Sequence, residues 1–251
     1  MIDALNGLNR QEFVGLPTGW EASFANPDVR SAYRNYALWV VQSFAPRYLG
    51  LGSEINTYMD AHPDDAPNFV SLYHEIYALV KAQSPATQVF VSFQWDDLNN
   101  MFPQPEEGDR QRLVTNWEQV EIFEPNLDLW VISTYPYLAF DDGVDIPADY
   151  YAPLLTRTDR PLAIAEGGFS TQPVGSGHST AEGQVAYLNA IHSQVGSRLA
   201  FWVNTLLNDF SADLLAENAS SLGVFAHTGL RDSDGSAKPA LAVWDSFRDG
   251  A

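Results

Sequence analysis

Residues 47–56 read RYLGLGSEIN, an apolar run of strand length that ends at Glu54. Residues 161–169 repeat this order as PLAIAEGGF, in which a short apolar run leads directly to Glu166. Stretches with helical spacing of apolar residues separate such runs along the chain. Short apolar strands that alternate with amphipathic helices are typical of parallel βαβ units, whose helices cover the sheet. The two stretches therefore predict an α/β fold.

The apolar pattern also predicts the remaining elements. Strands are expected at Ile2–Leu5, Arg47–Gly52, Gln88–Phe93, Leu127–Ser133, Pro161–Ala165 and Leu199–Val203. A first helix is expected after the Asn26–Pro27 cap, with Val29, Tyr33, Tyr36, Val40 and Phe44 on its buried face. Further helices are expected over Phe69–Val80, Leu113–Phe123 and Tyr150–Leu155. Two more should begin after a Ser179/Glu182 capping box and after Pro239. Since no linker or composition break interrupts the chain, we expect one domain over residues 1–251.

Composition narrows the class of function. The 251 residues are 45% hydrophobic, enough for a substantial core, and carry a formal net charge of -19. That charge argues against nucleic acid and anionic membrane surfaces as partners and fits a neutral substrate. The chain has no cysteine and no apolar run long enough to span a membrane. Its first residues, MIDALNGLNR, lack the features of a signal peptide, and the compartment stays open.

Glu54 and Glu166 are the candidate catalytic residues. Each follows an apolar strand directly, and the ends of barrel strands are where active sites of such folds lie. Two carboxyl groups that face one cleft can hydrolyse a glycosidic bond, because one donates a proton to the leaving oxygen while the other attacks the sugar. The alternative for either residue is structural, as a helix cap or the partner of an arginine.

LGLGSEIN followed by PLAIAEGGF resembles the large clan of retaining glycosidases whose catalytic glutamates follow barrel strands four and seven. Counting from residues 47–52 as strand four makes residues 161–165 strand seven. Within the clan, the sequence is similar to the endo-β-1,4-galactanases and their uncharacterised relatives. The resemblance implies a (β/α)8 TIM-type barrel that cleaves a β-linked polysaccharide or oligosaccharide by double displacement, without a cofactor or metal. Glu54 would be the acid/base and Glu166 the nucleophile.

The resemblance also implies residues that bind the carbohydrate. They are Tyr135, at a position where the clan often has a tyrosine that hydrogen-bonds the nucleophile, and Trp202, which matches an aromatic platform under the sugar. Gln94 and Trp95 are further candidates, and Asn6 and Arg10 are weaker ones. The clan usually has asparagine before the acid/base, where it binds the sugar 2-hydroxyl, but this chain has Ser53, which has a shorter reach. Asn56 is a further candidate, although it lies too close in sequence to be a simple replacement. This departure leaves open a catalytically inactive or sugar-binding relative, and the acidic surface leaves open an interaction protein.

The strand count indicates a truncated barrel. If residues 47–52 form strand four, Ile2–Leu5 is strand three and nothing before it supplies strands one and two. We therefore expect about six βα units, strands three to eight, cut from a longer protein whose secretion signal would lie upstream. The open sheet edges would make the chain marginally stable, dimeric or prone to aggregation. In the competing topology Glu12–Leu16 forms an additional strand and the barrel closes.

Overall fold

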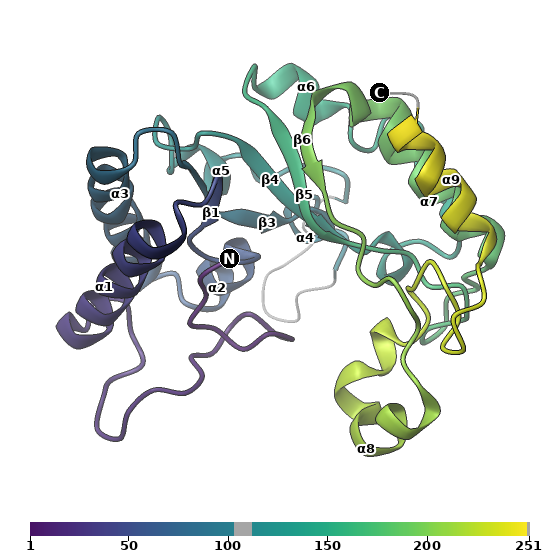
Figure 1. Ribbon diagram of the computed structural model, residues 1–251, viewed down its shortest axis with the longest axis horizontal. Coiled ribbons are helices and arrows are strands. Elements are labelled where there is room, and N and C mark those ends of the chain that lie inside the picture. The colour runs from purple at the N-terminus through teal and green to yellow at the C-terminus, as the bar shows by residue number, and fades with distance from the viewer. Residues whose placement is uncertain (103–111, 250–251) are drawn as a thin grey trace. The chain divides into compact units, whose positions relative to one another are not determined.

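The computed structural model describes residues 1–102 and 112–249, apart from the side chains of 217–221 and 248–249. The chain, drawn in Figure 1, divides into two compact units, Met1–Ile132 and Ser133–Ala251. The expectation of one domain over residues 1–251 stays a prediction.

The first unit alternates helices with short strands. Its elements are α1 (Pro27–Phe44), β1 (Tyr48–Gly50), α2 (Ile55–Ala61), α3 (Ala66–Gln83), β2 (Gln88–Phe90), β3 (Ser92–Gln94), α4 (Trp95–Leu98), α5 (Glu118–Glu121) and β4 (Trp130–Thr134), whose last two residues belong to the second unit. β1 pairs in parallel with β2, and Leu49 lies opposite Val89. β3 neighbours β4 in a separate sheet, so the single strand expected over residues 88–93 is two strands.

The N-terminal segment adds isolated bridges instead of a full strand. Ile2 bridges Leu51 in parallel, and Leu5 bridges Phe13 in an antiparallel sense. Ile2 is also held by its N–H, which donates to the carbonyl of Gly50 at 2.8 Å. The strand expected at residues 2–5 is therefore reduced to two single-residue contacts, one of them with the segment that the competing topology made a strand.

α1 begins as expected, with Asn26 as its N-cap and proline in the first turn, and it lies beside α3 (Figure 1). Its buried residues are Val29, Tyr33, Ala37 and Val41. The expectation for two other residues is wrong, since Tyr36 is 53% and Phe44 66% exposed. Successive residues of a helix are about 100° apart, which puts Tyr36 at the edge of the buried face. Phe44 is exposed because it is the last residue of the helix.

The core of the first unit centres on Phe123, which is fully buried. Its ring centroid lies 5.2 Å from that of Tyr73, 5.8 Å from that of Phe93 and 6.1 Å from that of Phe69. The long helix expected over residues 113–123 is wrong in its first half, because Leu113 has a left-handed backbone (φ 64°) and is 51% exposed. A single helical turn, α5, is enough to bring Phe123 into the core.

The second unit continues the alternation. Its elements are η1 (Pro136–Leu138), η2 (Gly143–Asp145), α6 (Pro153–Arg157), β5 (Leu162–Gly167), α7 (Ala181–Val195), η3 (Gly196–Arg198), β6 (Leu199–Trp202), α8 (Ala212–Leu222), η4 (Gly223–Phe225) and α9 (Pro239–Asp249). β5 and β6 pair in parallel, with Ile164 opposite Trp202. On the other side of β5, the N–H of Gly168 donates to the carbonyl of Thr134 at 3.3 Å. The strands and the covering pair α7 and α9 thus confirm parallel βα units (Figure 1).

The cap of α7 differs from expectation by one residue. Thr180, not Ser179, is the N-cap, and its Oγ1 accepts a hydrogen bond from the N–H of Gly183 at 2.9 Å. This shift places Glu182 at the second helical position and glycine at the third, so the reciprocal bond of a capping box has no side chain to make it. Ser179 is buried instead, and its Oγ has no hydrogen-bond partner within the described residues.

Candidate active site

Glu54 stands where β1 turns into α2. It is the N-cap of α2 with a left-handed backbone (φ 50°, ψ 42°), and it is only 8% exposed. Its N–H donates to Oγ of Ser92 at 3.1 Å, while its carbonyl accepts from the N–H of Thr57 at 3.0 Å. A residue with a side chain rarely adopts this conformation, and such outliers gather at functional sites. The backbone thus directs attention to Glu54 independently of its charge.

The carboxylate of Glu54 meets an arginine from the N-terminal segment. Nε of Arg10 lies 3.3 Å from Oε2 of Glu54, and Nη1 of the same guanidinium lies 2.9 Å from Oδ2 of Asp3. The side chains of Asp3, Arg10 and Glu54 are 17%, 12% and 11% exposed. Three charged groups therefore form a row of alternating sign near the end of β1.

Ser53 and Asn56, expected to contact sugar, are both buried. Ser53 is 1% exposed, with its Oγ 3.4 Å from Oγ of Ser92. Asn56 is fully buried, and its Nδ2 donates to Oδ2 of Asp97 at 2.8 Å and to the carbonyl of Gln94 at 3.2 Å. Its Oδ1 accepts from the N–H of Gln94 at 2.7 Å. These bonds tie the start of α2 to the end of β3, which supports a structural role for Asn56.

Gln94, Trp95 and Asn6 also make contacts within the unit. Gln94 caps α4, because its Oε1 accepts from the N–H of Asp97 at 2.7 Å. Trp95 is fully buried, with its ring centroid 5.9 Å from that of Trp117. Asn6 accepts from the N–H of Leu8 at 2.9 Å and so stabilises a turn. The structure brings Ser53, Glu54, Asn56 and Gln94 together around the ends of β1 and β3.

Sequence reasoning passed over the two carboxylates that follow Trp95. Asp96 is fully buried and Asp97 is 4% exposed. Nε2 of Gln94 donates to Oδ2 of Asp96 at 3.1 Å, and Asp97 accepts from Asn56. The signal that could have found them is the one used for Glu54 and Glu166, acidic residues just beyond a buried strand.

Glu166 lies near the carboxyl end of β5 and is partly exposed. The backbone beyond it is fixed on both sides. The carbonyl of Gly167 accepts from the N–H of Thr205 at 2.6 Å, and Gly168 donates to Thr134. A Cβ at position 168 would collide with the carbonyl oxygen of Thr205, so only glycine allows this approach. The chain therefore holds Glu166 at a fixed place in its strand.

The two aromatic candidates of the second unit lie in different surroundings. Tyr135 follows β4 and is 5% exposed, with its ring 6.2 Å from that of Tyr137 and 5.2 Å from that of Phe225. Trp202 turns its ring to α9, where the rings of Trp244 and Phe247 lie at 4.8 and 5.7 Å. Nε1 of Trp202 is buried, and no described residue accepts from it. These contacts place the ring of Trp202 beside α9, and the sugar platform implied by the resemblance stays a prediction.

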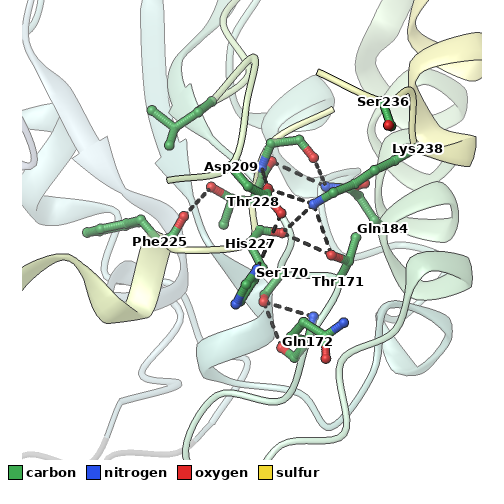
Figure 2. A network of polar contacts seen from close by, with 12 residues as sticks. Ser170, Thr171, Gln172, Gln184, Asp209, Phe225, His227, Thr228, Ser236 and Lys238 are labelled. Atoms are coloured by element: carbon green, nitrogen blue, oxygen red, sulfur yellow. Dashed lines mark hydrogen bonds and ion pairs between the residues drawn. The ribbon is translucent and has the colours of Figure 1, made fainter. Parts of the chain in front are cut away.

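A buried polar network holds the segment that follows β5 (Figure 2). Nζ of Lys238 donates to Oδ1 of Asp209 at 2.6 Å and to Oγ1 of Thr171 at 3.0 Å. Nδ1 of His227 lies 3.3 Å from Oδ2 of Asp209. Nε2 of Gln184 donates to the carbonyl of Phe169 at 2.9 Å and to those of residues 228 and 229. The side chains of Gln184 and Lys238 thus hold residues 169 and 171 of the loop that follows β5, and Asp209 in turn holds Lys238.

His178 lies in the loop between β5 and α7. The side chain of His178 is 80% exposed and lies 3.8 Å from Asp141. Across residues 1–102 and 112–249, no group of three histidine or acidic side chains is placed to hold a metal ion. No helix in that part of the chain is both long and apolar enough to cross a membrane.

Similarity to known proteins lies at the level of structure. No protein-family model and no curated protein matches the chain. A Rhizomucor miehei family 17 β-1,3-glucanosyltransferase matches over 88% of this chain and 73% of its own, with 20% identity and a TM-score of 0.55. The Ignisphaera aggregans GH53 catalytic domain matches over 91% and 70%, with 16% identity and a TM-score of 0.59. A fungal β-1,4-galactanase matches over 92% and 71%, with 18% identity and a TM-score of 0.60.

These matches extend over both units of the chain, and the structures matched are barrel glycoside hydrolases. Their identities of 16–20% establish a shared fold and nothing finer. Together with the parallel strands and covering helices, they confirm the fold expected from the sequence. The chain has the (β/α)-barrel fold of glycoside hydrolases.

Proposed function

We propose that this protein is a retaining β-glycoside hydrolase that acts on a β-linked polysaccharide or oligosaccharide. The observation that carries the proposal is the equivalent placement of two glutamates. Glu54 follows β1 and Glu166 is the second-last residue of β5, each near the carboxyl end of a parallel strand. That end of the strands holds the active site in barrel enzymes, and the fold similarity to glycoside hydrolases supports the same interpretation.

The proposed reaction is a double displacement. The carboxylate of Glu166 attacks the anomeric carbon, and the leaving oxygen takes the proton of Glu54 as the glycosidic bond breaks. Water then gives its proton to the Glu54 carboxylate and attacks the anomeric carbon, which releases Glu166. The product keeps the β configuration. No step requires a cofactor. The rate is expected to depend on pH as a bell, because one carboxyl must be ionised while the other is protonated.

A catalytically inactive, sugar-binding relative is the second candidate, and two observations weigh against full catalytic activity. Ser53 replaces the asparagine expected to bind the sugar 2-hydroxyl, and its Oγ lies 3.4 Å from that of Ser92. The ring of Trp202 packs on α9. Both observations concern residues expected to bind sugar, so they bear on the efficiency of catalysis more than on the fold.

One screen separates the two candidates. The protein is incubated with β-linked galactan, mannan, glucan and xylan, and released reducing ends are measured against a Glu166→Gln control. Reducing ends above the control, with the first product in the β form by proton NMR, support the retaining hydrolase. Retardation of the protein in a polysaccharide-containing gel without hydrolysis supports the sugar-binding relative. Neither hydrolysis nor retardation on any of the four polymers contradicts both.

A further inference from the structure

Arg10 and Glu54 share an unusual backbone conformation as well as an ion pair. Their φ angles are 54° and 50°, in the left-handed region that side chains disfavour. Residues persist in this region only when their surroundings enforce it. Nε of Arg10 and Oε2 of Glu54 therefore meet from two segments whose backbones are both strained. A chance ion pair at the surface does not require strain in either backbone.

The segment that carries Arg10 is fixed to the body of the unit. The carbonyl of Ile2 accepts from the buried hydroxyl of Tyr33 at 2.9 Å, in addition to the bond between its N–H and Gly50. Asp3, the next residue, accepts from Nη1 of Arg10 at 2.9 Å. The guanidinium of Arg10 is therefore held by Asp3 on one side while it contacts Glu54 on the other.

We propose that Arg10 is a positioning residue for Glu54, and this inference rests on the proposed function. A guanidinium presents its donors in a rigid planar fork, so Arg10 fixes one oxygen of Glu54 and with it the rotation of the carboxyl group. Glu54 must direct its proton to the leaving oxygen of the substrate. A displacement of about 1 Å can reduce a rate by about 100-fold. Arg10 thus acts on catalysis through Glu54.

The test uses the full chain and a pair of substrates that differ in their need for a proton. The first is β-1,4-galactan or whichever polymer the screen selects. The second is the 2,4-dinitrophenyl glycoside of the disaccharide unit of that polymer, whose leaving group departs unprotonated. Arg10→Met removes the ion pair, and Arg10→Lys retains a positive charge near Glu54. Arg47→Met is the matched control, because Arg47 is exposed and stacks on Tyr48.

The expected result is a selective loss. Arg10→Met should lower kcat on the polymer about 10- to 100-fold with little change in KM, and it should leave kcat/KM on the dinitrophenyl substrate within about twofold of wild type. Arg10→Lys should recover part of the loss, and Arg47→Met should behave as wild type on both. Equal losses on both substrates, as a merely structural role would give, overturn the proposal, and so does unchanged activity on the polymer.

A second readout keeps this inference separate from the proposed function. With glutamate labelled at 13Cδ, the Glu54 resonance is the one that disappears in Glu54→Gln. It should shift in Arg10→Met and stay in place in Arg47→Met. If the wild-type protein cleaves none of the substrates, the proposed function fails. Independently of activity, a Glu54 resonance that does not move in Arg10→Met overturns the ion pair and with it this inference.

Discussion

Nζ of Lys238 lies 2.6 Å from Oδ1 of Asp209, and the side chain of each is only 5% exposed. A buried charge without its partner is strongly destabilising, whereas the pair itself adds little over an apolar replacement. Lys238→Met should therefore lower the free energy of unfolding by about 3–5 kcal/mol, measured by urea denaturation. Lys238→Met combined with Asp209→Leu should lose less than the sum of the two single variants.

Arg34 provides the matched control for this pair. It lies 2.9 Å from Glu75, but both side chains are 35% exposed. Exposed ion pairs contribute about 0–1 kcal/mol, so Arg34→Met should change stability by no more than that. A loss in Lys238→Met as small as the loss in Arg34→Met would show that the Lys238–Asp209 pair is not buried in solution.

Phe123 should be among the least replaceable core residues of the first unit. Truncation of a fully buried phenylalanine removes its transfer free energy and leaves a cavity, so Phe123→Ala should cost about 3–5 kcal/mol. Phe44→Ala, at a site that is 66% exposed, should stay within about 0.5 kcal/mol of wild type. Urea denaturation followed by tryptophan fluorescence measures both. Similar losses at the two positions would contradict the packing of three rings around Phe123.

Asp65 should make stability depend on pH in the acid range. Its carboxylate accepts from the hydroxyls of Ser23 (2.7 Å) and Tyr58 (2.6 Å), the N–H of Phe24 (2.7 Å) and the amide of Asn68 (3.0 Å). Burial alone would raise the pKa of Asp65, but these four hydrogen bonds together hold it below the ordinary value of 3.8. The stabilisation of the folded state by ionised Asp65 is therefore fully present above about pH 4, near the pKa of an unfolded aspartate. It is lost as the pH falls through the lower pKa that Asp65 has in the folded protein.

Two variants isolate this contribution. In Asp65→Asn the loss of stability between about pH 4 and pH 2 should be smaller than in wild type, because the titrating group is gone. Asp64→Asn, at the exposed neighbouring position, should keep the wild-type slope. Thermal unfolding across this range measures the slopes. Parallel slopes in wild type and Asp65→Asn would rule out Asp65 as the source.

The two proposed catalytic glutamates should respond differently to substitution. Glu166→Gln should reduce turnover by about 10³-fold or more with the fold intact, because an amide cannot attack the anomeric carbon. Glu54→Ala should lose activity on polysaccharide but recover much of it on substrates with good leaving groups. Glu182→Gln, an exposed position on α7, should remain active. Wild-type activity in Glu166→Gln on the natural glycan would refute the assignment.

The sequence predicted the elements whose signals are local. Asn26 followed by proline marks the start of α1, and the apolar run before Glu166 marks β5. One-residue details were missed where two residues carry similar signals, as with Ser179 and Thr180, since either hydroxyl can cap a helix. The helix α8 was missed altogether, although residues 212–222 are a continuous helical stretch.

The candidate site was harder to predict because its contacts are long-range. Lys238 and Asp209 are 29 residues apart, and Arg10 and Glu54 are 44 apart, so no periodicity joins them. Trp202 was expected at the sugar because it lies in the last strand. Alternate residues of a strand face opposite sides, and the packing of α9 against Trp202 decides which side its ring takes.

Because the backbone of Glu54 is left-handed, the residue that suits folding at position 54 differs from the residue that the proposed reaction needs. Glycine adopts this conformation without strain and asparagine tolerates it, so a library at position 54 that is selected only for soluble expression should accept both. The same library selected for turnover should return glutamate. Deep mutational scans run under the two selections are therefore expected to disagree most sharply at this codon, whereas at Phe123 both should demand the same large apolar residues.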